Sequence, residues 1–175
     1  EIWEDEREEG PQWPGEREEE LSDNLASAAL LEREVYRRAG IRDDDISSQV
    51  LVWGKSFSQG TIPVSLTLQQ VENLSDWPCC SDLFVVENPP VFATLLDALP
   101  QSGPVASRDS IPEPVLVCIS GQPSAAAVLL IDRLLQQAPS AKLRYSGDFD
   151  VNGLRIASGL ARRYPNHYQP WRMMR

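Results

Sequence analysis

The chain has 175 residues, of which 42% are hydrophobic and 24% charged, and its formal net charge is −10 at pH 7. These values are ordinary for a globular protein, and the length suffices for one domain with an additional segment. No apolar run approaches the roughly 20 residues of a membrane-spanning helix, and the acidic N-terminus lacks the basic-then-apolar pattern of a signal peptide.

The negative charge is concentrated in residues 1–20, which hold ten acidic residues and two arginines and therefore carry −8 of the total −10. We expect residues 1–21 to form an acidic, mobile segment, since charge blocks of this kind are usually solvated. Arginines gather late in the chain, and they indicate either an anionic partner or a solvated helix face. These arginines are Arg144, Arg155, Arg162, Arg163, Arg172 and Arg175.

The three cysteines do not indicate a disulfide framework, because their number is odd and Cys79 and Cys80 are adjacent. Cys118 lies within the apolar run VLVCIS, where we expect a buried thiol. A zinc site would need more cysteine or histidine partners, and His167 is the single histidine. The cysteine usage favours a reduced, cytoplasmic setting.

The first expected elements precede the regular part of the chain. Residues 22–45 have a capping residue, apolar positions at helical spacing and a closing glycine, so we expect a helical lead-in. SQVLVWG, from residue 48, predicts a short strand. PVSLTLQQVEN, from residue 63, predicts a strand that leads into a short helix.

From about residue 82 apolar strands alternate with amphipathic helices. DLFVVEN, EPVLVCIS, AKLRYSGDFD and YQPWRMM predict strands. PPVFATLLDAL, GQPSAAAVLLIDRLLQQAP and VNGLRIASGLARRYP predict helices between them. The second helix presents a stripe of Ala127, Val128, Ile131, Leu134 and Leu135, and the third is expected to bury Leu154, Ala157, Leu160 and Ala161.

This alternation predicts an α/β domain over residues 46–175, built on a parallel sheet of about four strands with helices on both faces. Continuous apolar strands agree with burial on both faces of a parallel sheet. Right-handed crossovers place the carboxyl ends of all parallel strands on one edge, where such sheets bind ligands.

Three carboxylates are expected to meet at that edge. Glu87 ends the first of these strands, and Asp148 and Asp150 end the third. Mutual repulsion of such carboxylates is costly unless a cation neutralises them, and oxygen ligands of this kind suit Mg²⁺ or Mn²⁺. Gly147 and Gly153 would allow a tight turn beside the ligand.

The second strand ends in Ser120, Gly121 and Gln122, which we expect at a helix N-terminus that can hold phosphate. Each motif also has a structural interpretation. An Asp-x-Asp pair is common in turns, Glu87 can cap the next helix, and Ser120 can be a helix cap. Their joint placement at three strand ends favours a metal site.

A glutamate after one strand and Asp-x-Asp after a later one resembles the Toprim pattern of topoisomerases, primases and nucleases. GDFDVNG is similar to the DxDxxG form of the topoisomerase VI A subunit and its meiotic relatives. VVENPPVF, CISGQPSAA, LRYSGDFDVNGLRIA and QPWRMM together resemble the C-terminal domain of the Toprim nuclease subunit of Wadjet-type (JetD-like) plasmid-defence systems. The resemblance extends from about residue 46 to the end.

The resemblance implies a metal-dependent endodeoxyribonuclease in which Glu87, Asp148 and Asp150 bind Mg²⁺ or Mn²⁺. It implies that Ser120, Gly121 and Gln122 border the scissile phosphate. The implied partners are double-stranded DNA, an SMC-like motor and kleisin-type subunits, with a homodimer also open. The family has more chain on both sides of this region, so we expect a fragment that is cut short at its C-terminus.

The expected reaction is phosphodiester hydrolysis, with Glu87 as a metal ligand or as the base that takes a proton from water. Arg155, one helical turn beyond the aspartates, is either a phosphate-binding residue or a surface residue.

Two alternative functions remain open. One is a non-catalytic Toprim module that binds DNA or metal within an assembly. The other is topoisomerase-like transesterification, for which Tyr145, Tyr164 and Tyr168 are present without a recognisable nucleophile context. A phosphatase with an Asp-x-Asp nucleophile is disfavoured. Such enzymes tend to place the pair on the first strand with a hydroxyl residue after it, whereas here the pair follows the third strand and Val151 comes next.

Overall fold

A computed structural model of the protein describes residues 35–36, 38–39, 46–54, 56–58, 62–99 and 113–173. The acidic segment predicted for residues 1–21 lies outside these residues. The helical lead-in predicted for residues 22–45 also lies outside them, apart from four positions between residues 35 and 39.

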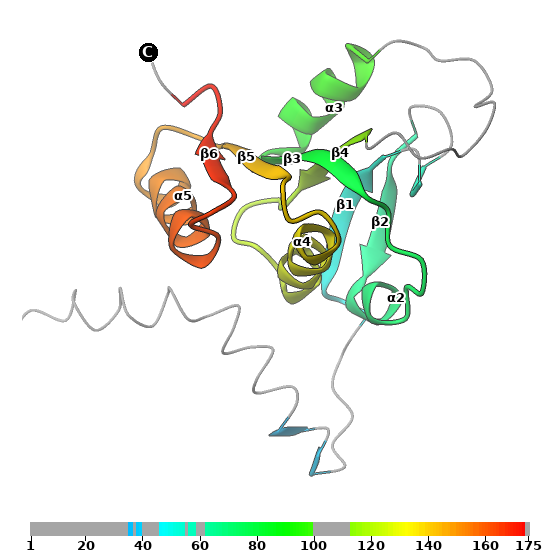
Figure 1. The fold of residues 1–175 in the computed structure, drawn as a ribbon. Coiled ribbons are helices and arrows are strands. Elements are labelled where there is room, and N and C mark those ends of the chain that lie inside the picture. Colours follow the sequence, from blue (N-terminus) through cyan, green and yellow to red (C-terminus); the bar gives the residue numbers. More distant parts are fainter. Residues whose placement is uncertain are drawn as a thin grey trace, which may run out of the picture.

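The described part of the chain contains six strands and four helices, and all the strands predicted from the sequence are present (Figure 1). The strands are β1 Gln49–Trp53, β2 Val64–Thr67, β3 Cys80–Val86, β4 Glu113–Cys118, β5 Lys142–Ser146 and β6 Tyr168–Pro170. The helices are α2 Leu68–Glu72, α3 Pro89–Asp97, α4 Ala125–Gln137 and α5 Val151–Arg163. The α/β class predicted from the alternation is confirmed.

The sheet differs from the predicted parallel sheet of about four strands. Within the described residues it has six strands in the order β2-β1-β4-β3-β5-β6. The four strands β3 to β6 are parallel to one another, whereas β1 runs antiparallel to both β2 and β4. The antiparallel pair lies on the β4 side, and Val50 and Val52 of β1 alternate inward and belong to the same core as the parallel strands.

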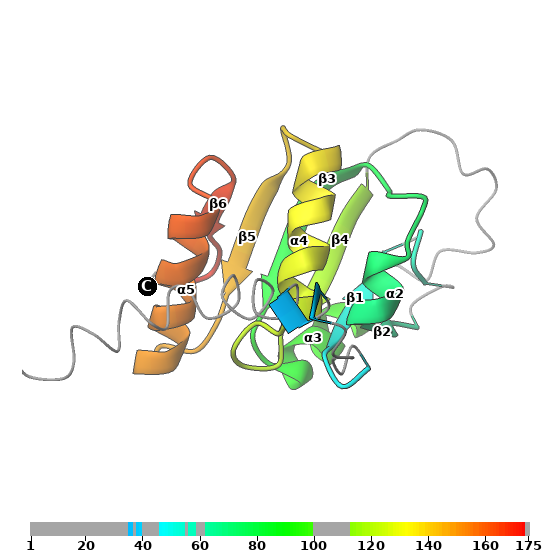
Figure 2. The same cartoon turned by 90° about the horizontal axis from the view of Figure 1, so that it is seen from below.

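The helices cover the two faces of the sheet unequally. Figure 1 shows α3 on one face and α2, α4 and α5 on the other. From below, α4 lies along the middle of the sheet with α2 and α5 on either side of it (Figure 2). The chain therefore moves from β3 to β4 over one face and returns from β4 to β5 over the other, which makes β3 the point where the strand order reverses.

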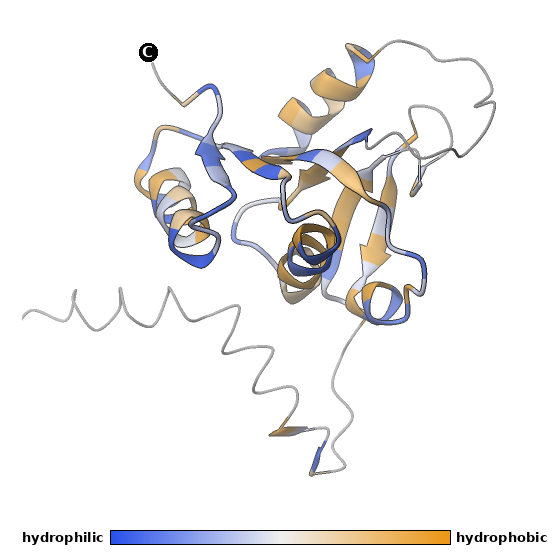
Figure 3. Ribbon diagram, in the orientation of Figure 1, coloured by the Kyte–Doolittle hydropathy of each residue, from blue (hydrophilic) through white to orange (hydrophobic). Residues whose placement is uncertain are grey.

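The larger hydrophobic core lies between the sheet and helices α2, α4 and α5. The apolar stripe predicted for α4 is confirmed, since its five members are all buried. A smaller core packs α3, through Phe92 and Leu96, against β3 and β4. Figure 3 shows the corresponding distribution, with β4 mainly hydrophobic and β6 hydrophilic.

Of the stripe predicted for α5, only Leu160 is buried, while Ala157 and Ala161 are half-buried and Leu154 is exposed. Leu154 is 53% exposed, and the buried positions of the helix are Gly153, Ile156 and Leu160. The helix is rotated so that Gly153, rather than Leu154, faces inward, because the backbone of Asp148 packs against Gly153. Tyr164 continues the buried face just after the helix ends.

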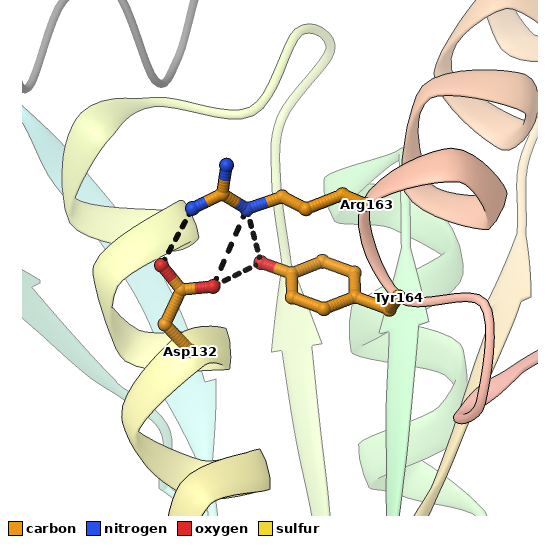
Figure 4. A network of polar contacts seen from close by, with 3 residues as sticks. All are labelled: Asp132, Arg163 and Tyr164. Carbon is orange, nitrogen blue, oxygen red and sulfur yellow. Dashed lines mark hydrogen bonds and ion pairs between the residues drawn. The ribbon is translucent and has the colours of Figure 1, made fainter.

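A polar network joins α4 to the end of α5 (Figure 4). The Tyr164 hydroxyl donates to Asp132 Oδ1 over 2.7 Å, and Arg163 Nη2 pairs with Asp132 Oδ2 over 2.7 Å. Burial, and then the Asp132 charge, raise the pKa of Tyr164 well above its ordinary value. Tyr164 therefore stays a hydrogen-bond donor that fixes one helix against the other.

Stability is expected to fall between pH 9 and about 11, because burial raises the pKa of the Cys80 thiol to about 11 from its ordinary 9.0. In this window the unfolded thiol loses its proton while the folded thiol keeps it. The unfolded state therefore binds fewer protons, and the free energy of unfolding decreases with pH by at most about 1.4 kcal/mol per unit. Thermal unfolding at pH 8, 9 and 10 checks this. Cys80→Ala should flatten the dependence, and an equal slope in both proteins would contradict the prediction.

None of the described helices is long and apolar enough to cross a membrane.

Candidate functional site

The candidate site lies where the neighbouring parallel strands β3 and β5 end. Val86 and Ser146 are register partners, and Glu87 N–H donates to Ser146 O over 3.1 Å. Glu87 directly follows β3, and Asp148 lies two residues after the end of β5. The parallel register therefore brings these two predicted site residues together, as expected from the sequence.

Glu87 is the buried acid of the site, with 7% of its surface exposed. Its Oε2 accepts a hydrogen bond from the Asp148 backbone N–H at 3.0 Å and one from the Tyr145 hydroxyl at 3.3 Å. Its Oε1 has no hydrogen-bond partner among the described residues, and it is not sealed from solvent. Oε2 of this buried carboxylate is thus hydrogen-bonded within the protein, whereas Oε1 can still accept a ligand.

Asp148 is exposed and is joined to the end of β3 by a second contact. Its Oδ1 accepts a hydrogen bond from Asn88 Nδ2 at 2.9 Å. Asn88 is the N-cap residue of α3 but makes no side-chain cap bond there, because its amide reaches Asp148 instead. The sequence interpretation of Glu87 as a cap for α3 is therefore wrong, and Asn88 occupies that position.

Asp150 is exposed and caps α5. Its Oδ1 accepts a hydrogen bond from Gly153 N–H at 2.8 Å, which satisfies one of the free amides of the first helical turn. The turn interpretation of the Asp-x-Asp pair is therefore correct for this residue. The cap occupies one carboxylate oxygen, and Oδ2 has no hydrogen-bond partner among the described residues.

Two glycines let the Asp148 turn approach Glu87 and α5 closely. A Cβ on Gly147 would lie 2.6 Å from Glu87 Oε2 and still nearer the Tyr145 hydroxyl. A Cβ on Gly153 would overlap the carbonyl oxygen of Asp148. Neither glycine has a positive φ, so both positions require the absence of a side chain rather than an unusual backbone conformation.

The segment from Ser120 to Gln122 does not start a helix, contrary to the sequence prediction. Ser120 and Gly121 have φ values of 54° and 96°, which are incompatible with a right-handed helix. Helix α4 begins at Ala125, and the Ser124 hydroxyl caps it by accepting from Ala127 N–H. Gly121 N–H instead donates to Glu87 O over 3.2 Å, which fastens this loop to the backbone of the site.

The donor chemistry of the three carboxylates fits a hard divalent cation. Each has one oxygen in a protein hydrogen bond and one without a partner among the described residues. Mg²⁺ is usually bound through one or two carboxylates, with waters and substrate phosphate oxygens completing its coordination. Within the part of the chain that the structure describes, however, no three His, Cys, Asp or Glu side chains lie close enough to form a ready metal group. Asp148 and Asp150 are exposed, and each is held by one hydrogen bond, to Asn88 and to Gly153 N–H respectively.

Two site residues were not identified as such from the sequence. Asn88 directly follows Glu87, and a side-chain amide next to a predicted ligand indicates a residue that can reach the same site. Tyr145 was considered only as a nucleophile, although strand alternation places it with Leu143 on the buried face of β5. Arg155, the predicted phosphate ligand, is exposed on α5.

Comparison with known proteins gives a family but no activity. No curated protein matches the chain. A family model does match residues 64–175, which is more than half of the chain and includes β2 to β6 with all the predicted site residues. The chain therefore belongs to the family described as "Protein of unknown function C-terminus" (DUF2399).

Proposed function

We propose that this chain is the Toprim domain of a metal-dependent DNA endonuclease, the nuclease subunit of an SMC-associated plasmid-defence system of the Wadjet (JetD-like) type. The observation that carries the proposal is the pairing of Glu87 with the Asp148 turn at the carboxyl ends of β3 and β5. This is the edge, and the reversal point, at which open α/β sheets bind ligands. The motifs that resemble the Wadjet nuclease lie within the family match.

A bound Mg²⁺ or Mn²⁺ would stabilise charge on the phosphate and lower the pKa of a coordinated water. Glu87 would bind the cation through Oε1 or accept the proton of the attacking water. Asp148 and Asp150 would each present the carboxylate oxygen that the protein does not use. The burial of Glu87 supports this assignment, because a buried carboxylate without a cationic partner is unfavourable.

The remaining predicted residues would contact the DNA. Gly121 is fastened to Glu87 O, so the Ser120–Gln122 loop would border the scissile phosphate through backbone groups rather than a helix N-terminus. Arg155 would hold a neighbouring phosphate. Double-stranded DNA would be delivered by the SMC-like motor and its kleisin-type partner.

Transesterification by a tyrosine is less well supported. Tyr145 is wholly buried and Tyr164 nearly so, and burial is the first cause of the raised pKa of each. A buried phenol that keeps its proton is a poor nucleophile. Burial also raises the pKa of the half-buried Tyr168.

Plasmid cleavage tests the proposal. Full-length protein is incubated with supercoiled plasmid and Mg²⁺ or Mn²⁺, alone and with its SMC-like partner complex. We expect nicked or linear plasmid, and we expect Asp148→Asn to reduce the rate more than about 100-fold, beyond the effect typical of residues that only support a ligand. Asp97→Asn is the matched control, because Asp97 is an exposed aspartate at the far end of α3.

The arms of the experiment separate the alternatives. Cleavage only with the partner complex would show gating by the motor. Equal behaviour of wild type and Asp148→Asn in every condition would reject the nuclease and leave the non-catalytic assembly module. A covalent protein–DNA adduct would instead indicate transesterification.

A further inference from the structure

Tyr145 joins the core of the domain to the candidate site. It is the fourth residue of β5, its side chain belongs to the core beneath α4 and α5, and none of it is exposed. A buried phenol hydroxyl needs a hydrogen-bond partner. Its partner is Glu87 Oε2, at 3.3 Å.

The direction of this hydrogen bond is fixed. An ionised carboxylate only accepts hydrogen bonds, whereas a phenol hydroxyl carries a proton. The Tyr145 hydroxyl therefore donates and Glu87 Oε2 accepts. The hydroxyl is neutral, so this contact does not compensate the negative charge of the Glu87 carboxylate. That charge remains available to a cation.

The two donors to Glu87 act on the same oxygen. The Asp148 amide reaches Oε2 from the turn after β5, and the Tyr145 hydroxyl reaches it from within that strand. Because both bonds are to Oε2, they restrict rotation of the carboxylate and determine which oxygen is left free. Gly147 separates the two donors, and any side chain there would displace them.

We propose that Tyr145 is a positioning residue for Glu87, whose Oε2 it holds so that Oε1 is presented to a divalent cation. This inference rests on the proposed function. Supporting residues of this kind typically change metal affinity or activity by about 10–100-fold when they are removed.

The chain offers a matched control for the experiment. Tyr164 is also a buried tyrosine whose hydroxyl donates to a carboxylate, that of Asp132, and its network lies between α4 and the end of α5. Tyr145→Phe and Tyr164→Phe each remove one buried hydroxyl bonded to an acid. A purely structural role predicts the same kind of effect for both, whereas a positioning role predicts a difference in metal binding.

Mn²⁺ affinity is measured by titration calorimetry on the full-length wild type, Tyr145→Phe, Tyr164→Phe and Asp148→Asn, beside thermal unfolding and plasmid cleavage. Tyr145→Phe should weaken Mn²⁺ binding about 10–100-fold and raise the Mn²⁺ concentration needed for half-maximal cleavage. Tyr164→Phe should lower the unfolding temperature without changing Mn²⁺ affinity. In wild type labelled with ¹³C at tyrosine Cζ, Mg²⁺ should shift the Tyr145 signal and leave that of Tyr164 in place.

The outcomes distinguish the two proposals. If wild type binds Mn²⁺ and cleaves DNA while Tyr145→Phe equals wild type, or while both tyrosine variants weaken binding equally, the positioning role is overturned and the nuclease stands. If wild type itself neither binds Mn²⁺ nor cleaves, the proposed function fails and the positioning role falls with it.

Discussion

Alanine at position 153 is expected to destabilise the domain by about 1–3 kcal/mol, although alanine is normally the better helix former. The added Cβ would overlap the Asp148 carbonyl oxygen and lie 2.9 Å from the Asp148 carbonyl carbon. These are backbone atoms, so neither side-chain rotation nor a small local adjustment relieves the contact. The Asp148 turn or the start of α5 must move, and with it the Asp150 cap on Gly153 N–H. Urea unfolding of Gly153→Ala measures the loss.

Gly159 provides the control within the same helix. An added Cβ there meets nothing within 4 Å, so only helix propensity acts, and Gly159→Ala should stabilise the domain by about 0.5–1 kcal/mol. The two substitutions are chemically identical and differ only in their surroundings. If Gly153→Ala stabilised the domain as Gly159→Ala is expected to, the Asp148 turn would not pack against α5 as described.

Alanine at position 147 is expected to damage the site as well as the fold. Its Cβ would lie 2.6 Å from Glu87 Oε2 and 2.7 Å from Tyr145 Cζ, both of which are buried. Neither side chain has space to withdraw, because Tyr145 is held in the core. We expect a loss of about 1–3 kcal/mol in urea unfolding together with a weakening of Mn²⁺ binding of at least about 10-fold.

Gly54 is a suitable comparison for Gly147. It is buried beside the sheet, whereas Gly147 is half-buried, and its nearest atom is Val115 Cγ2 at 3.3 Å, a contact that a small shift relieves. Gly54→Ala should therefore have a smaller effect on stability and none on Mn²⁺ affinity. Loss of stability without loss of Mn²⁺ affinity in Gly147→Ala would place the bound Mn²⁺ away from Glu87.

The sequence was sufficient to predict the parallel core because its signals there are local. Apolar runs alternate with helical stripes, and Pro89 and Pro90 mark the start of α3. The antiparallel addition of β1 and β2 was not predictable in the same way. Both strands were recognisable, but which edge they join depends on pairing between residues far apart, such as Leu51 with Cys118.

The predictions for the site were correct where the order of the elements decides the geometry, and wrong where a turn or close packing decides it. Glu87 and Asp148 were placed together correctly, because parallel register follows from the order of elements. The Ser120 turn was mistaken for a helix start, because a positive φ at a serine leaves no sequence signal. Leu154 was predicted to be inward because it is apolar, whereas the close packing of Gly153 against Asp148 sets the rotation of α5.

The two parts of the candidate site, Glu87 and the turn after β5, differ in how well the fold tolerates substitution there. Glu87 is buried, and its backbone is tied to β5 and to the Gly121 loop, so altering it means altering the centre of the sheet. The turn after β5 instead exposes Asp148, Asp150 and, between them, Phe149, which is 65% exposed. Exposed turn positions tolerate replacement far better than central strand ends. The packing of the sheet therefore constrains Glu87 directly, whereas Phe149, which lies between the two aspartates, can be replaced without disturbing the sheet.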